Sequence, residues 1–100
     1  MTNVEIANII LEQMGGGHKL NVMVGAQNFV ATNKGLQFNF KGCRRTNKIT
    51  ISLDPSDTYT VQFWRITNRP VLHLVETYTD IYADNLIPLF EKFTGLYLTL

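Results

Sequence analysis

The sequence predicts a small α+β domain: an antiparallel sheet of about five to six strands, with an N-terminal and a C-terminal helix packed on one face. Three observations predict it. Apolar and polar residues alternate through the middle of the chain, apolar residues recur at spacings of three and four near both ends, and short turns join the segments. Residues 1–100 are expected to form one domain, because a chain of 100 residues can bury one modest core.

The first element is expected to be a helix over residues 3–14. Thr2 followed three places later by Glu5 matches the capping-box pattern of a helix start. One helix face is then apolar, through Val4, Ala7, Ile10, Leu11 and Met14. The run Gly15–Gly17 is expected to stop the helix, because glycine readily adopts the left-handed conformation found at helix ends.

The next segments have strand character. Strands are expected at residues 20–24 and 29–32, separated by a turn at 25–28. Asn33-Lys34-Gly35 is a hairpin signal, since Asn and Gly tolerate a positive φ. Residues 36–41 alternate most clearly, with Leu, Phe and Phe facing one side.

Three further strands are predicted at residues 48–53, 58–66 and 71–78. They are separated by a basic loop at 42–47 and by turns at 54–57 and 67–70. Since the helices are expected to cover the apolar face, the other face should be open to water. That open face would carry Gln37, Asn39, Lys41, Lys48, Thr50, Ser52, Thr60, Gln62 and Trp64.

A second helix is expected near the C-terminus. Asp84 is the predicted N-cap, with Asp80 as an earlier alternative, and Pro88 falls in or near the first turn, where proline costs least. The apolar stripe consists of Leu86, Leu89, Phe90 and Phe93, and Gly95 ends the helix. Residues 96–100 are expected either to add a short edge strand or to pack as a tail.

Composition excludes several classes of protein. An apolar fraction of 45% with 17% charged residues is not that of a disordered chain. The single cysteine, Cys43, cannot form an intramolecular disulfide. No stretch approaches the roughly 20 apolar residues that a membrane span needs. We therefore expect a soluble protein of the reducing cytoplasm, without a membrane partner.

The sequence carries no recognisable catalytic motif. His18 and His73 are the only histidines, and neither belongs to a metal-binding pattern. Cys43 precedes two arginines but has no evident catalytic partner, so a free loop thiol is the expected state. Gly15–Gly17 lacks the spacing of a phosphate-binding loop. We expect a protein that is not an enzyme, with no metal and no cofactor.

Charge is distributed unevenly along the chain. Between residues 18 and 53 every charged residue is basic, and a basic surface with an exposed aromatic ring is typical of single-stranded nucleic-acid binding. The predicted phosphate-binding residues are Lys41, Arg44, Arg45 and Lys48, with Trp64 stacking on a base. A plain solvated polar face and a protein-binding face are the alternatives for the same surface.

The C-terminal third is mostly acidic. Glu76, Asp80, Asp84 and Glu91 form the alternative site, a docking surface for a basic partner protein that the chain would inhibit. The two charged regions could instead neutralise each other within the fold. A third hypothesis is self-association through an unpaired strand edge, for example as a homodimer.

Six segments of the sequence carry a resemblance to a known family. They are the segments 23–29, 36–41, 49–53, 57–63, 81–86 and 90–98, of which Thr94-Gly95-Leu96-Tyr97 is the most specific. Over residues 20–100 the chain resembles a family of small uncharacterised bacteriophage and prophage proteins. The resemblance implies a phage origin and expression in the bacterial cytoplasm, and it assigns no catalytic residue. By analogy, the expected partner is single-stranded nucleic acid or a host protein.

Overall fold

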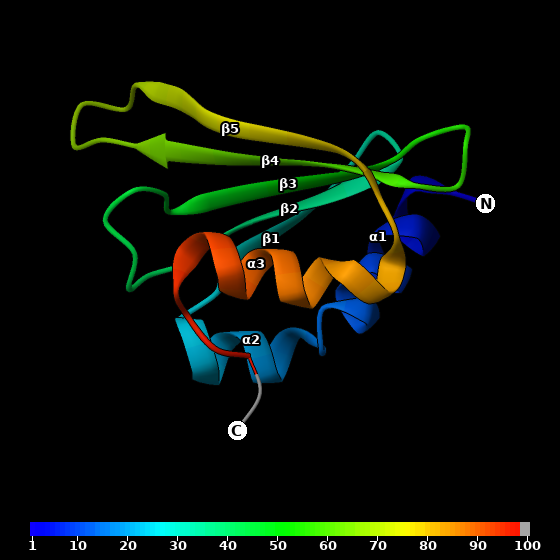
Figure 1. Cartoon of the computed structure of the whole chain (residues 1–100), viewed down its shortest axis with the longest axis horizontal. Helices are drawn as coiled ribbons and strands as arrows, with labels where there is room; N and C mark the ends of the chain where they lie inside the picture. The colour runs from blue at the N-terminus through cyan, green and yellow to red at the C-terminus, as the bar shows by residue number, and fades with distance from the viewer. Residues whose placement is uncertain (99–100) are drawn as a thin grey trace.

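The computed structural model describes residues 1–98 and confirms the predicted α+β class (Figure 1). Within those residues the sheet has five antiparallel strands in the order β1-β2-β3-β4-β5. The strands are β1 (Gln27–Thr32), β2 (Gly35–Asn39), β3 (Lys48–Leu53), β4 (Tyr59–Ile66) and β5 (Leu72–Ile81). The helices are α1 (Asn3–Gln13), α2 (Gly17–Val24), α3 (Leu86–Thr94) and the 3-10 helix η1 (Ala83–Asn85).

Each strand pairs with the next one along the chain, as the short turns predict. Alternation explains which side chains are buried. In β3, Ile49 and Ile51 are buried and pair with the buried Phe63 and Val61 of β4, whereas Thr50 between them is partly open to solvent. The sheet therefore has one apolar face and one polar face.

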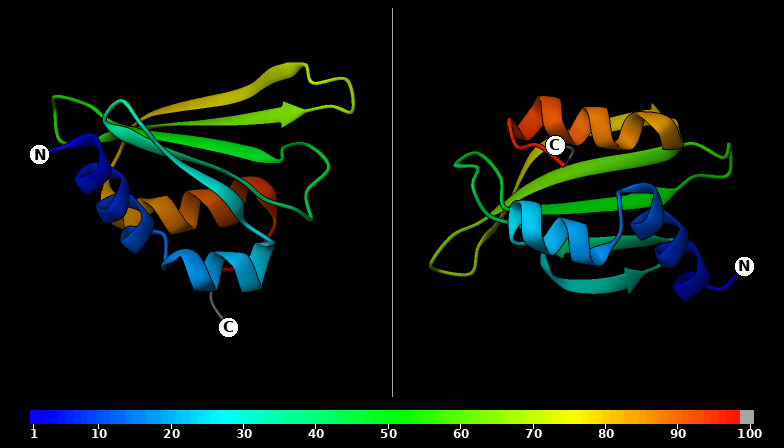
Figure 2. Two further views of the ribbon diagram at one scale, coloured as in Figure 1. Left: turned by 180° about the vertical axis from the view of Figure 1, so that it is seen from behind. Right: turned by 90° about the horizontal axis from the view of Figure 1, so that it is seen from below.

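All three α-helices lie on the apolar face (Figures 1 and 2). The helix α1 contacts β1 and β2, whereas α3 lies under the β4–β5 side of the sheet. Aromatic rings fill the space above α3: Phe90 lies 5.0 Å from Phe40, and Phe93 stacks on Phe63 at 4.2 Å between ring centroids. The predicted placement of an N-terminal and a C-terminal helix on one face is confirmed.

The predicted strand at residues 20–24 is wrong, because this segment belongs to the helix α2. Leu20 and Val24, four residues apart, are buried, whereas Val22 between them is exposed. That spacing is helical, but five residues are too few to distinguish the two periods in the sequence. The glycine run does not separate a helix from a strand, because Gly17 already begins α2.

The C-terminal helix begins slightly later than predicted. Asp84 lies inside η1, whose N-cap is Tyr82, so the predicted capping role of Asp84 is wrong. Pro88 does fall in the first turn of α3, and Gly95 ends the helix with a φ of 75°. Residues 96–98 form no strand, and Leu98 is fully buried as part of a packed tail. The last two residues of the predicted 96–100 segment lie outside the described residues.

Candidate functional site

The five residues predicted to bind nucleic acid do not gather on one surface. Lys48 and Trp64 are cross-strand partners, and both face the open side of the sheet. Lys41 follows β2 and packs on α2, where its backbone N–H donates to the Val24 carbonyl at 2.8 Å. Arg44 is exposed on the loop between β2 and β3. The structure thus brings together only Lys48 and Trp64 of these five residues. Arg45 lies on the opposite side of the sheet, next to Phe93.

Arg45 is directed towards α3. Its guanidinium carbon lies 4.4 Å from the centre of the Phe93 ring, a distance typical of a cation–π contact. Phe93 also stacks on Phe63, so one ring joins the guanidinium to the aromatic core. Within residues 1–98 the Arg45 side chain has no hydrogen bond and no ion pair. Its donors are therefore available to a ligand.

The two residues after Arg45 fix the loop to β4. Thr46 is fully buried, and its hydroxyl donates to the Trp64 carbonyl at 2.7 Å. The Asn47 side chain then pairs with the backbone of Ile66 through two hydrogen bonds. Because buried polar contacts are specific in geometry, they determine where the preceding arginine points.

Over β2, β3 and the middle of β4, the open face of the sheet is polar and nearly uncharged. Its central side chains are connected, since Trp64 Nε1 donates to Thr50 Oγ1 at 3.1 Å and Thr50 contacts Gln62 Oε1 at 3.4 Å. Trp64 is half-buried, and its indole N–H already has a partner. This face supplies one lysine, Lys48, for phosphate contacts, so it is a weak electrostatic match to nucleic acid.

The four predicted acidic docking residues also differ in placement. Glu76 and Asp80 lie on β5 and Asp84 lies in η1, and all three are exposed. Glu91 instead accepts a hydrogen bond from the Leu98 N–H at 2.8 Å and thereby secures the tail against α3. Three of the four thus remain on an accessible side of the molecule.

Strand β5 forms one edge of the sheet. It has ten residues and pairs with β4 along one side, while no strand of residues 1–98 pairs with its other side. Two of its apolar side chains, Leu72 and Leu74, are 47% and 50% exposed. They are the cross-strand partners of Ile66 and Trp64, so the four side chains form one apolar cluster on the open face, which we call the edge patch.

The pairing of β5 with β4 has two irregularities, one opposite Tyr59–Val61 and one in the middle of the strand. Leu74 pairs with Trp64 and Glu76 pairs with Phe63, so Val75 is an extra residue between two successive pairs, that is, a β-bulge. The bulge places Glu76 on the face covered by α3, whereas the leucines of the edge patch face the open side. Tyr78, the partner of Val61, also faces α3.

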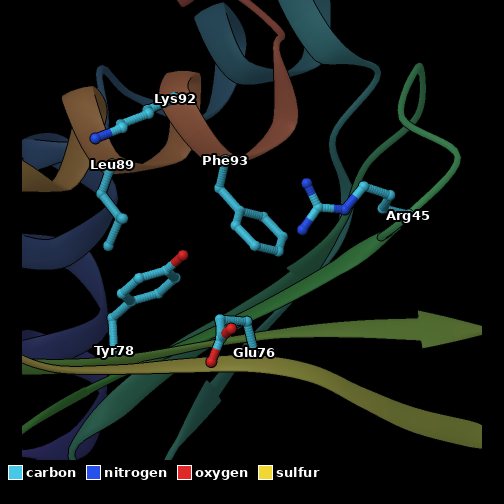
Figure 3. A pocket seen from close by; sticks show the side chains of 6 residues that line it. All are labelled: Arg45, Glu76, Tyr78, Leu89, Lys92 and Phe93. Carbon is cyan, nitrogen blue, oxygen red and sulfur yellow. The ribbon is translucent and has the colours of Figure 1, made fainter.

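A pocket of about 290 Å³ lies between β5 and α3 (Figure 3). Arg45, Glu76, Tyr78, Leu89, Lys92 and Phe93 line it. Figure 3 shows the Arg45 guanidinium beside the Phe93 ring and the Glu76 carboxylate below them. Glu76 Oε1 accepts the backbone N–H of Thr77 at 3.0 Å, which keeps this carboxylate close to its own strand.

Other groups that commonly carry chemistry are dispersed. His73 is exposed on β5, His18 is exposed on α2, and Cys43 is a half-buried free thiol. In residues 1–98, no three His, Cys, Asp or Glu side chains are grouped to hold a metal ion. Among the described helices, none is long and apolar enough to cross a membrane.

The edge patch and the pocket are the features that the sequence did not identify. The pocket combines a loop, a strand and a helix that are distant in the chain, so no local motif marks it. A signal for the edge was present: Val71, Leu72, Leu74 and Val75 form an apolar segment without alternation in the last predicted strand. An edge strand that exposes such residues is unusual in a monomer.

Comparisons with protein-family models, with curated proteins and with solved structures gave no match. The resemblance to phage and prophage proteins therefore stays a prediction.

Proposed function

We propose that this chain is a non-catalytic protein-binding domain that takes an extended segment of a partner protein along the free edge of β5. The observation that carries the proposal is a ten-residue edge strand, β5, whose own residues Leu72 and Leu74 are about half exposed. Strand addition of this kind uses main-chain hydrogen bonds for affinity and alternate side chains for specificity.

The composition of β5 supports this role. Natural sheets block their edges with lysines, prolines, bulges or very short strands. The strand β5 contains two irregularities and one inward-facing charge, Glu76, but no lysine and no proline, and it is the longest strand among residues 1–98. The opposite edge strand, β1, has six residues, and a register irregularity interrupts its pairing. Of the two edges, β5 thus offers the longer template for a partner strand.

A host protein is the kind of partner that we favour. A phage origin, which the family resemblance implies, would make an inhibitor of a bacterial host or defence enzyme a natural function. Inhibitors need a complementary surface and no catalytic group. The exposed carboxylates of Glu76, Asp80 and Asp84 lie on or just after β5, where they would favour a basic partner surface.

Binding of single-stranded nucleic acid is the second candidate, and one observation favours it. Lys48 and Trp64 are neighbours on the open face. A single nucleic-acid strand could therefore place a phosphate on Lys48 and stack a base on Trp64. The separation of Lys41 and Arg45 from that pair places this candidate second. A self-associating structural protein, in which two copies pair through β5, would use the same edge as the first candidate.

Paired substitutions on the two sheet edges test the leading proposal. The double variant Leu72→Lys/Leu74→Lys puts charge beside the free edge of β5, and Val30→Lys makes the same change on β1, where Val30 is 46% exposed. Tagged protein is used to recover partners from bacterial lysate, and each recovered protein is then purified and titrated against the three chains.

The proposal expects a partner that binds the unchanged chain and Val30→Lys equally but loses binding to the β5 variant. A partner that binds all three chains alike would contradict it. A salt-dependent affinity for oligonucleotides that Lys48→Gln abolishes would favour the second candidate. Light scattering that shows a dimer sensitive to the β5 variant would favour self-association.

A further inference from the structure

The pocket between β5 and α3 lies directly beside the edge that the partner segment would occupy. Side chains of an added strand alternate between the two faces of the sheet, so every second one would point towards α3. Glu76 and Tyr78 mark that side of β5, and Leu89 and Lys92 form the opposing wall. The pocket is thus placed to receive one side chain of the partner.

The pocket is large enough to admit a single side chain. Its volume of about 290 Å³ is just below the range of roughly 300–1,000 Å³ that is common for small-molecule sites. Its walls combine the apolar surfaces of Leu89 and Phe93 with polar groups at one end. A side chain with an aliphatic stem and a polar end group would contact both.

The charges of the pocket determine which end group fits. Arg45 and Lys92 supply two cations, and Glu76 supplies one carboxylate. Further towards the β4–β5 turn, Arg65 pairs with His73 on the same side of the sheet as Glu76. The local charge is therefore positive, which favours an anionic group.

Arg45 is also prepared geometrically for a carboxylate. Its contact with Phe93 restricts the guanidinium, and the bonds of Thr46 and Asn47 to β4 fix the adjoining backbone. Within residues 1–98 the guanidinium donates to no acceptor. A planar guanidinium binds a carboxylate through two parallel hydrogen bonds, and less conformational freedom is lost when it is already held in place.

Glu76 does not occupy that position itself. Its carboxylate accepts from the Thr77 N–H, and no ion pair with Arg45 forms among the described residues. We infer that the pocket selects a glutamate side chain in the extended partner segment, with its carboxylate on Arg45 and its methylenes against Leu89 and Phe93. This inference rests on the proposed function, because it assigns the chemistry of the segment that adds to β5.

Two synthetic peptides test the inference without knowledge of the natural partner. The first, KTVEVTK with blocked ends, would direct its central glutamate towards α3 and its two valines towards the open face of the sheet. The second, KTVQVTK, differs in the central residue alone. Each is titrated into isotopically labelled protein while the backbone amide shifts of β5 and of the 42–47 loop are followed.

The glutamate peptide is expected to bind about five- to tenfold more tightly than the glutamine peptide. Its carboxylate would accept two charge-assisted hydrogen bonds from the Arg45 guanidinium, whereas the glutamine carboxamide is neutral. Arg45→Gln should abolish this preference, and Arg45→Lys should retain part of it. The matched control is Arg44→Gln, since Arg44 is the exposed neighbour in the same loop and does not line the pocket. The preference should also diminish with added salt.

The outcomes separate the inference from the proposed function. Equal binding of both peptides along β5 would overturn the glutamate pocket and leave strand addition in place. A preference for glutamate that survives Arg45→Gln would also overturn the inference. Shifts confined to the pocket and the loop would support the carboxylate site and contradict strand addition. No shift of β5 and no shift of the 42–47 loop with either peptide would overturn both.

Discussion

The carboxamide of Asn47 pairs with the backbone of Ile66 as a neighbouring strand would: Nδ2 donates to the carbonyl at 2.9 Å, and Oδ1 accepts from the N–H at 2.8 Å. The side chain thereby continues the sheet pairing one residue before β3 begins at Lys48. Asn47 and Thr46, whose hydroxyl donates to the Trp64 carbonyl, together join the end of β4 to the loop that carries Arg45.

Replacing Asn47 with alanine should destabilise the protein. Two backbone groups of Ile66 would lose their partner, so we expect the free energy of unfolding to fall by about 1–3 kcal/mol. Urea denaturation measures the change. Asn68→Ala, in the exposed β4–β5 turn, is the control and should stay within about 0.5 kcal/mol of the unchanged chain. Equal effects of the two substitutions would contradict this role of Asn47.

Phe90 is expected to be the most sensitive position of α3. It is fully buried and contacts the rings of Phe40 and Phe63, which belong to different parts of the sheet layer. Phe90→Ala should cost about 3–5 kcal/mol through lost burial and a cavity, and Phe90→Leu should cost less. Tyr97→Ala, at a side chain that is 70% exposed, serves as the control in thermal denaturation. A small loss at Phe90 would show that the core rearranges around the cavity.

Tyr59 links stability to alkaline pH. Burial raises the pKa of this phenol above its usual value of 10.0, the nearby Asp57 carboxylate adds to the increase, and the hydrogen bond to Gln13 opposes it. Below the usual value the hydroxyl is protonated in both the folded and the unfolded chain, so its contribution is constant. As the pH rises above that value, the unfolded chain ionises first and stability falls.

Substitution of Tyr59 with phenylalanine should therefore reduce the loss of stability above the usual tyrosine pKa. Denaturation midpoints measured over an alkaline pH series, together with the near-ultraviolet absorbance of tyrosinate, test this prediction. The same pH dependence in both chains would contradict it.

Replacing each of two glycines, Gly25 and Gly17, with alanine should change the stability of the protein in opposite directions. Gly25 ends α2 with a φ of 65°, and an added Cβ would lie 3.3 Å from Lys41 Cδ, so Gly25→Ala should cost about 1–2 kcal/mol. Gly17 begins the same helix, and its added Cβ would make an ordinary contact of 3.8 Å with Leu11. Gly17→Ala should therefore stabilise the protein by about 0.4–1 kcal/mol. Chemical denaturation of both variants under one condition provides the comparison.

The sequence predicts the secondary structure best in the strands where buried and exposed residues alternate. Phe38, Ile49, Val61 and their neighbours have polar residues on either side, and a half-buried strand is the structure that separates such residues onto two faces. The prediction of a strand around Leu20 is wrong for a physical reason: the segment is too short to show its helical spacing, and the glycines before it resemble a helix stop signal.

The candidate site was harder to predict than the fold. The charge of Arg45 predicts a binding role, but the direction of its side chain depends on tertiary contacts with Phe93 and on the fixed positions of Thr46 and Asn47. Lys48 and Trp64 were correctly placed on one face because strand alternation determines their side. The sequence predicts Glu91 on a docking surface, whereas in the structure its carboxylate accepts a hydrogen bond from the backbone of Leu98.

The extra residue at Val75 has a consequence for any strand that lies along β5. Because it shifts the alternation by one position, the residues before it and after it are out of phase with each other. A second shift, opposite Tyr59–Val61, interrupts the strand again. A partner with strict period-two alternation can match one segment of β5 at a time, unless it carries irregularities of its own. The recognised sequence should therefore be a short linear motif, shorter than the ten residues that β5 presents.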